Sequence, residues 1–256
     1  MKKITSIALA CLVTISPLTY ANVQASDGNN TPVVVTDESN TTNKTKTTIK
    51  YKTKTIDKSK EFKGSKSSVM AEYTYKRIVL KGKSKAIKKI NKRLKKYCTS
   101  FFTKDKNQDL PVIFEYAKNA SEFRDYNDSY CDSVTQQVSF VNKKYICISA
   151  SSHWYAGGVT NSSTIGYTFN LKTGKQVKKI TSFTKTKSLK KIKQQLVQKI
   201  NEKDAGYTTT EIADKGSRDF DFIIDKDGNV VVCFGPYELG YGGFTKFITL
   251  DGKFKK

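Results

Sequence analysis

Alternating apolar and polar residues mark the first predicted strands of the chain. Ile49 and Tyr51 alternate with Lys50 and Lys52, which is the period of a half-exposed β-strand. A second strand is predicted at about 69–80. The folded part of the chain is therefore expected to begin near residue 47 with two strands.

Apolar residues at spacings of three and four predict two amphipathic helices. The first spans 84–102, and the second begins after Ser188, a favourable N-cap residue. The opposite face of each helix is rich in lysine, and we favour packing on a sheet over binding to a membrane surface. The apolar stripes consist of Ile87, Ile90, Leu94, Tyr97, Cys98 and Phe101 in the first helix, and of Leu189, Ile192, Leu196 and Ile200 in the second.

Further strands are predicted as hairpins, each bounded by turn-forming residues. The pattern thus favours the α+β class, with a mainly antiparallel sheet and two amphipathic helices packed on it. The predicted strands are 133–141 and 144–151 around Asn142-Lys143, 165–171 before Lys172-Thr173-Gly174, 220–224 and 230–234 around Asp225–Gly228, and 244–250.

The N-terminus has the pattern of a bacterial export signal. Lys2 and Lys3 precede an apolar run over 4–18, and small residues follow before Ser26. The run is too short and too often interrupted for a membrane span, and lipidation at Cys11 is not favoured, because little of the run precedes it. We predict a signal peptide at 1–25 and an extracellular or wall-associated protein after cleavage.

Residues 26–46 are rich in Asn, Thr, Ser and Asp and poor in large apolar groups. Such a segment buries too little apolar surface to offset the conformational entropy lost on folding. It is predicted to be a disordered linker.

Positive charge is concentrated in the folded part of the chain. The formal net charge is +23, and removal of the signal peptide lowers it to +21. Residues 47–256 contain 42 basic and 20 acidic residues, a net charge of +22. This charge attracts polyanions such as teichoic acids, anionic lipid headgroups or nucleic acids, although it serves solubility alone equally well.

The residue inventory argues against catalysis and against a cofactor. His153 is the only histidine, so neither a histidine relay nor a two-histidine metal site can form. Asp225 and Asp227 belong to a sequence that suits a hairpin turn, and the roughly twelve-residue calcium loop with its closing glutamate is absent. We therefore expect a protein without enzymatic activity, bound metal or cofactor.

Two aromatic segments are candidate ligand-binding sites. His153, Trp154 and Tyr155 lie before the turn at Gly157-Gly158, and Tyr237, Glu238 and Tyr241 lie in a glycine-rich loop. Aromatic side chains stack on sugar faces and give contact area at a small entropic cost. For both segments a structural role remains the favoured interpretation. The first would pack as ordinary side chains, and the second would form a turn fixed by Pro236.

Four cysteines remain after export: Cys98, Cys131, Cys147 and Cys233. An even number in an oxidising compartment allows three disulfide pairings, and the sequence does not choose among them. Buried free thiols are the alternative, since a core of about 210 residues does not need disulfides for stability.

Several short motifs occur in a characteristic order along the chain. They are Lys89-Ile90-Asn91-Lys92, the segment from Tyr167 to Lys175, Phe183 before a helix, Asp225 to Phe234, and Pro236-Tyr237-Glu238-Leu239. Their order resembles a pair of extracytoplasmic modules that form the sensor part of the lysozyme-responsive anti-sigma-V factor and precede the catalytic domain of a bacterial peptidoglycan deacetylase. The family usually has Ala-His-Gly after two glycines, whereas Gly157-Gly158 is followed by Val159-Thr160-Asn161 here.

The resemblance implies two α+β modules, at 47–165 and 166–256, packed as one globular unit outside the cell. It implies binding or sensing, with wall glycan or lysozyme as candidate ligands. We favour a non-enzymatic module that binds an anionic wall polymer or peptidoglycan, without specific nucleic-acid binding.

Two alternatives remain. The first is a lysozyme-binding sensor or inhibitor, which repulsion between two basic proteins opposes. The second is an enzyme acting on wall glycan through Glu238, Asp219 or Asp221, which would need a pair of carboxylates at a defined separation.

Overall fold

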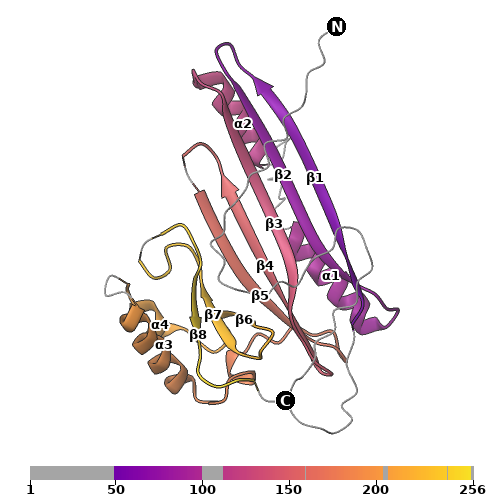
Figure 1. Cartoon of the computed structure of the whole chain (residues 1–256), viewed down its shortest axis with the longest axis vertical. Helices are drawn as coiled ribbons and strands as arrows, with labels where there is room; N and C mark the ends of the chain where they lie inside the picture. Colours follow the sequence, from indigo (N-terminus) through magenta and orange to yellow (C-terminus); the bar gives the residue numbers. More distant parts are fainter. Residues whose placement is uncertain (1–48, 100–111, 159, 204–206, 241, 255–256) are drawn as a thin grey trace.

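The computed structural model describes residues 49–99, 112–158, 160–203, 207–240 and 242–254 (Figure 1). The predicted signal peptide and linker, and Tyr241 of the candidate loop, lie outside these residues.

A five-stranded sheet forms the larger part of the fold. Its strands are β1 (Tyr51–Lys63), β2 (Ser68–Leu80), β3 (Asp128–Val141), β4 (Tyr145–Tyr155) and β5 (Thr160–Asn170), and they lie in this order across the sheet. All neighbours are antiparallel except β2 and β3, which are parallel. The mainly antiparallel α+β fold is thus confirmed.

The last three strands form a second, smaller sheet. β6 (Asp221–Ile224), β7 (Val230–Phe234) and β8 (Lys246–Thr249) are antiparallel, with β7 in the centre and buried along its whole length. The turn between β6 and β7 is stabilised by Asp225, whose carboxylate accepts hydrogen bonds from the backbone N–H groups of Asp227 and Asn229 at 2.9 and 2.8 Å. This is the hairpin chemistry that the sequence predicts.

Both predicted helices are present, and the described residues contain two further α-helices. α1 (Lys85–Thr99) and α3 (Leu189–Lys203) are the predicted ones, and α2 (Val112–Phe123) and α4 (Thr210–Asp214) are additional. Ser188 caps α3 as expected, since its Oγ accepts a hydrogen bond from the backbone N–H of Lys191 at 3.4 Å. A 3-10 turn, Ile180–Ser182, precedes α3.

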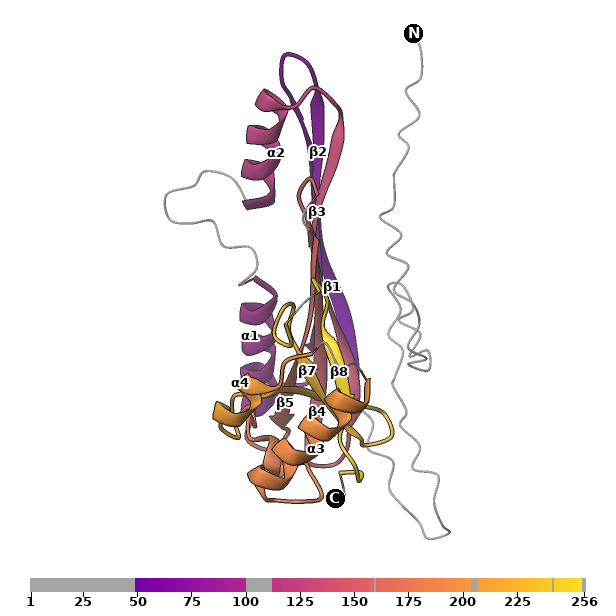
Figure 2. The same ribbon diagram turned by 90° about the vertical axis from the view of Figure 1, so that its left-hand side faces the viewer.

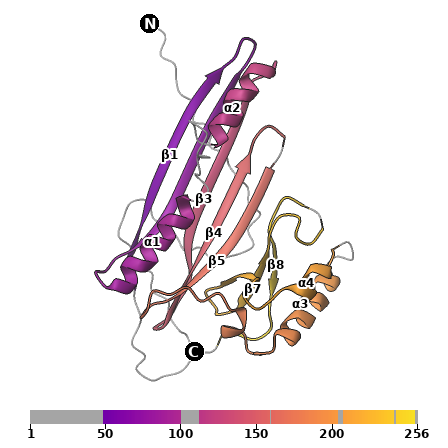
Figure 3. The same ribbon diagram turned by 180° about the vertical axis from the view of Figure 1, so that it is seen from behind.

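The five-stranded sheet has α1 and α2 on one face, and the small sheet and α3 pack on part of the other. Figure 2 shows α1 and α2 on one side of it, and Figure 3 shows both helices in front of the strands. Ile146 and Cys147 are neighbours in β4 and point to opposite faces. Ile146 packs in a core with Ile90 and Leu94 of α1, whereas Cys147 packs in a core with α3 and the small sheet. The large sheet therefore lies between two hydrophobic cores.

The predicted module boundary at residue 165 falls within β5. β5 pairs with β4 along its whole length, and the backbone at Gly166 approaches Phe222 of β6 closely. The small sheet thus packs directly against the last strand of the large one.

Candidate functional site

A small cavity opens on the face of the large sheet that α2 covers. Its volume is about 270 Å³. Four of its six described lining residues are polar, although most of the wall surface is apolar, and the residues come from α2, β3, β4 and β5. They are Val112, Asp132, Ser152, Trp154, Asn161 and Ser163, and together they are called the Trp154 cavity below.

The strand register brings these side chains together. Trp154 of β4 lies directly opposite Asp132 of β3 on one side and Asn161 of β5 on the other. Ser152 lies opposite Ser163 in the same way. Directly opposed residues share a face of the sheet, so five polar or aromatic side chains from three strands converge under the first turn of α2.

Asp132 gives the cavity a carboxyl group that is hard to ionise. Burial raises its pKa to about 6, although a hydrogen bond from the Tyr75 hydroxyl to Oδ2 acts in the opposite direction. The pKa of Tyr75 is raised in turn, first by burial and then by the neighbouring carboxylate. The carboxyl group is therefore a hydrogen-bond acceptor near neutral pH and becomes a donor below about pH 6.

Trp154 forms the aromatic wall of the cavity. It is half-buried, and its ring meets Tyr116 of α2 edge to face, with 5.6 Å between the ring centroids. Asn161 and Ser163 differ from Asp132 in that no described residue hydrogen-bonds with their side chains. Two polar groups next to the indole thus have no side-chain hydrogen bond within the part of the chain that the structure describes.

The other two candidates of the first segment do not line this cavity. His153 points to the opposite face, where its Nδ1 lies 2.8 Å from Ser162 Oγ, and burial lowers its pKa, so the ring is neutral at pH 7. Tyr155 packs edge to face against Tyr130 with centroids 6.3 Å apart. Of the three neighbours, only Trp154 reaches the cavity.

The loop after β7 lies along the free edge of β5. The backbone N–H of Ser162 donates to the carbonyl of Gly243 at 2.7 Å, and the side chains of Tyr237 and Asn161 both lie close to Gly243. Tyr237 is 58% exposed and has a φ of 64°, which is unusual for a residue with a side chain. Tyr237 therefore lies near one wall of the cavity without lining it.

Glu238 has structural partners instead. Its Oε1 lies 2.6 Å from the Lys215 ammonium, and its Oε2 accepts a hydrogen bond from the backbone N–H of Gly235 at 2.6 Å. Both carboxylate oxygens thus stabilise the loop.

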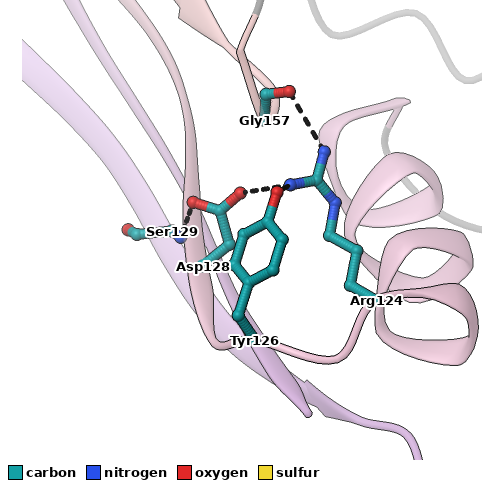
Figure 4. Close-up of polar contacts among 5 residues, drawn as sticks. All are labelled: Arg124, Tyr126, Asp128, Ser129 and Gly157. Carbon is teal, nitrogen blue, oxygen red and sulfur yellow. Dashed lines mark hydrogen bonds and ion pairs between the residues drawn. The ribbon is translucent and has the colours of Figure 1, made fainter.

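Arg124, just after α2, ties the turn at the end of β4 to the start of β3 (Figure 4). Its guanidinium donates to the carbonyl of Gly157 at 3.0 Å, pairs with Asp128 at 3.1 Å and hydrogen-bonds to the Tyr126 hydroxyl. Asp128 also accepts a hydrogen bond from the backbone N–H of Ser129 at 2.8 Å. The arginine therefore holds the strand ends next to the cavity in place.

The outer face of α1 is strongly basic. Seven basic residues and no acidic residue occur in this helix, and all seven are exposed. The helix lies on the same side of the large sheet as α2. The α1 basic face consists of Lys85, Lys88, Lys89, Lys92, Arg93, Lys95 and Lys96.

A second hollow, of about 620 Å³, lies between α3 and α4. It is larger than the Trp154 cavity, but its walls are mainly apolar groups and lysine side chains, with no comparable convergence of polar groups. Its lining is Leu189, Lys190, Lys193, Gln194, Val197, Thr209, Ile212 and Ala213.

Of the two alternatives for Cys98, Cys131, Cys147 and Cys233, disulfides or buried free thiols, the structure has buried free thiols. Burial raises the pKa of Cys98, Cys147 and Cys233, which keeps these thiols protonated and poorly reactive. Among the described residues, no group of three or more His, Cys, Asp or Glu side chains is arranged to bind a metal ion, and no helix is long and apolar enough to cross a membrane.

Sequence reasoning found Trp154 but missed Asp132, Asn161 and Ser163. Polar residues are common in strands, and nothing in the spacing of these three distinguishes them from solvent-facing neighbours. Only the pairing of β3, β4 and β5 places them around one tryptophan.

The fold is similar to that of solved proteins. No protein-family profile matches the chain, and no curated protein matches it. The crystal structure of a member of the DUF3298 family, a domain of unknown function, from Bacteroides fragilis has a TM-score of 0.54 and 14% identity, covering 78% of this chain and 90% of that one. A DUF3298 family protein from Pseudomonas aeruginosa has a TM-score of 0.45 and 9% identity, covering 77% and 88%. At such identity, the first likeness shows a shared fold.

Proposed function

We propose that this chain is a secreted, non-enzymatic binding module of the bacterial envelope that recognises an anionic wall polymer or glycan. The observation that supports this proposal is the α1 basic face, which presents seven cations on one exposed helix surface without a carboxylate. A polyanion binds such a surface more strongly than it binds the same number of scattered lysines, because the electrostatic fields of neighbouring cations add.

The localisation part of the proposal rests on the N-terminal sequence and on the motif resemblance. Lys2 and Lys3 before the apolar run over 4–18 favour export, and the motif order favours an extracytoplasmic module like those of the anti-sigma-V factor and the peptidoglycan deacetylase. A membrane surface rich in anionic lipid would be attracted by the same lysines.

The lysozyme and enzyme alternatives have less support. The α1 basic face repels a basic lysozyme at long range. Asp219 accepts a hydrogen bond from the backbone N–H of Gly216 at 2.8 Å and Glu238 is paired with Lys215, so two of the three candidate carboxylates have structural partners. We infer no reaction from these residues.

Removing charge from α1 tests the proposal. In the test variant, Lys85, Lys88, Lys89 and Lys92 are changed to Gln, and poly(glycerol phosphate) is the probe. We expect binding to weaken by about tenfold or more at low ionic strength, with a shallower dependence on salt, because the remaining field attracts the polymer less strongly. The measurement is a binding isotherm at two salt concentrations.

The control variant removes the same total charge from four separate places on the surface. Lys58 of β1, Lys118 of α2, and Lys172 and Lys226 in turns, all exposed, are changed to Gln. We expect this variant to lose less than about threefold in affinity, because only the general field is reduced. Equal losses in the two variants would mean that binding depends on net charge and that α1 forms no specific site.

A further inference from the structure

We propose that the Trp154 cavity binds one uncharged sugar ring. The inference deepens the glycan part of the proposed function, on which it rests, by giving that part a site distinct from the α1 basic face. It rests on the polar groups of the cavity, its charge and its size.

The polar groups of the cavity provide the hydrogen-bond donors and acceptors that neighbouring sugar hydroxyls need. A sugar hydroxyl donates one hydrogen bond and accepts others, so it needs both kinds of partner in a small space. The Asp132 carboxylate accepts, the Asn161 amide does both, and the hydroxyl of Ser163 does both. Because Asn161 and Ser163 have no side-chain hydrogen bonds with described residues, a ligand would not have to break an existing network.

Trp154 supplies the apolar contact. A sugar ring has one face of C–H groups, which packs on an aromatic surface and buries apolar area. The indole stands between Asp132 and Asn161 on the same face of the sheet, so a ring stacked on it has its hydroxyl edge toward those two side chains. Tyr116 meets the indole edge to face and fixes its orientation.

The charges favour an uncharged ligand. No basic residue is among the described residues that line the cavity, and Asp132 would repel a phosphate or a carboxylate placed beside it. A cation would instead be opposed by the net charge of +22 on residues 47–256. A neutral polyhydroxylated ring avoids both penalties.

The size of the cavity limits the ligand to about one ring. Its volume of about 270 Å³ lies just below the range of about 300–1,000 Å³ that is typical of sites for drug-sized molecules. A longer glycan would place one residue in the cavity and the remainder outside. From there, an attached anionic group could reach the α1 basic face, which lies on the same side of the sheet.

The test uses the intrinsic fluorescence of the protein. Trp154 is the only tryptophan in the chain, so its emission reports on this cavity alone. The purified protein is titrated with N-acetylglucosamine, with glucose and, as the charged comparison, with glucuronic acid, at about 0.5 M salt, where long-range attraction is screened. We expect a saturable change in Trp154 emission with a neutral sugar at a Kd on the order of 1 mM, and at least roughly tenfold weaker binding of glucuronic acid.

Two neighbouring substitutions on β5 locate the site. Asn161→Ala removes a cavity amide, whereas Ser162→Ala changes the adjacent residue, which points to the other face and contacts His153. We expect a loss of affinity of about tenfold or more for Asn161→Ala and of less than about twofold for Ser162→Ala. Ser163→Ala is the second cavity variant, in case Asn161→Ala does not fold.

The inference is overturned if neither neutral sugar changes Trp154 emission in a saturable way. Equal effects of the Asn161 and Ser162 substitutions, or binding of glucuronic acid as tight as that of the neutral sugars, also overturn it. The α1 variant separates this result from the proposed function. If the α1 variant binds neutral sugars as tightly as the unchanged protein, the cavity binds sugar independently of the α1 basic face. If that variant loses only its binding to poly(glycerol phosphate), the inference about the cavity is still supported.

Discussion

Asp132 is held partly buried beside Tyr75, and its ionisation therefore opposes folding. Its folded-state pKa of about 6 lies above the value of 3.8 for a free carboxyl group. Between these two values the folded protein binds a proton that the unfolded chain does not, so stability falls as the pH rises through this window. The loss of stability caused by the ionised Asp132 is complete above about pH 6 and absent below about pH 4.

Asp132→Asn tests this penalty. The amide keeps an acceptor for the Tyr75 hydroxyl and removes the charge. We therefore expect the free energy of unfolding to rise by about 1–2 kcal/mol at about pH 7.5. The gain is not larger because solvent screens the partly exposed carboxylate. Urea denaturation at about pH 7.5 and about pH 4 gives the comparison, and the gain should vanish at the lower pH. A gain of the same size at both values would show that the cause is not ionisation.

Strand β5 joins the two sheets, because it belongs to the large sheet and packs against the small one. One side of it pairs with β4, and at Gly166 the backbone lies so close to β6 that a Cβ atom there would overlap the carbonyl oxygen of Phe222. A glycine is required at this position because of that approach, and not because of its backbone conformation.

Gly166→Ala should therefore separate the small sheet from β5. We expect a loss of about 2–3 kcal/mol in the free energy of unfolding, because the methyl group has no space without movement of β6. Ser163→Ala is the control on the same strand, since it removes an atom and adds none, and it should change stability by less than about 0.5 kcal/mol. If Gly166→Ala is as stable as the control, the close approach to Phe222 is wrong.

The sequence predicts individual elements better than their arrangement. β2 and β7 were predicted almost to their ends, β7 from an unbroken apolar run, and the start and apolar stripe of α3 were predicted correctly. α2 was missed because Val112–Phe123 contains several β-branched or aromatic residues, which have a low helix propensity. Without α2, neither the parallel pairing of β2 with β3 nor the wall of the cavity could be predicted.

At the scale of the whole molecule, all four cysteines of the region after residue 25 are buried, and three of them belong to the hydrophobic cores. Cys98 packs with α2 and the large sheet, and Cys147 and Cys233 pack with α3 and the small sheet. Their exposed fractions are 0, 0 and 3%, and that of Cys131 is 5%. Reaction with a thiol reagent therefore requires the cores to open.

Thiol labelling reports on this burial. In a chain carrying Cys11→Ser, we expect almost no reaction of the folded protein over minutes and four reactive thiols under denaturing guanidinium without reductant. Fewer than four thiols after denaturation would establish a disulfide. The count is made by absorbance of the released chromophore, and a reduced and denatured sample is the reference.

The parallel pairing of β2 with β3 also has consequences for how the chain folds. β1 and β2 form one hairpin, and β3, β4 and β5 form a meander, so each half of the large sheet can be built from contacts that are close in sequence. The two halves pair where Val69 to Lys76 lie beside Asp128 to Thr135, and the chain passes through α1 and α2 between these two strands. Closing so long a connection slows folding. We therefore expect the β2–β3 pairing to form late, after the β1–β2 hairpin and the β3–β4–β5 meander have assembled.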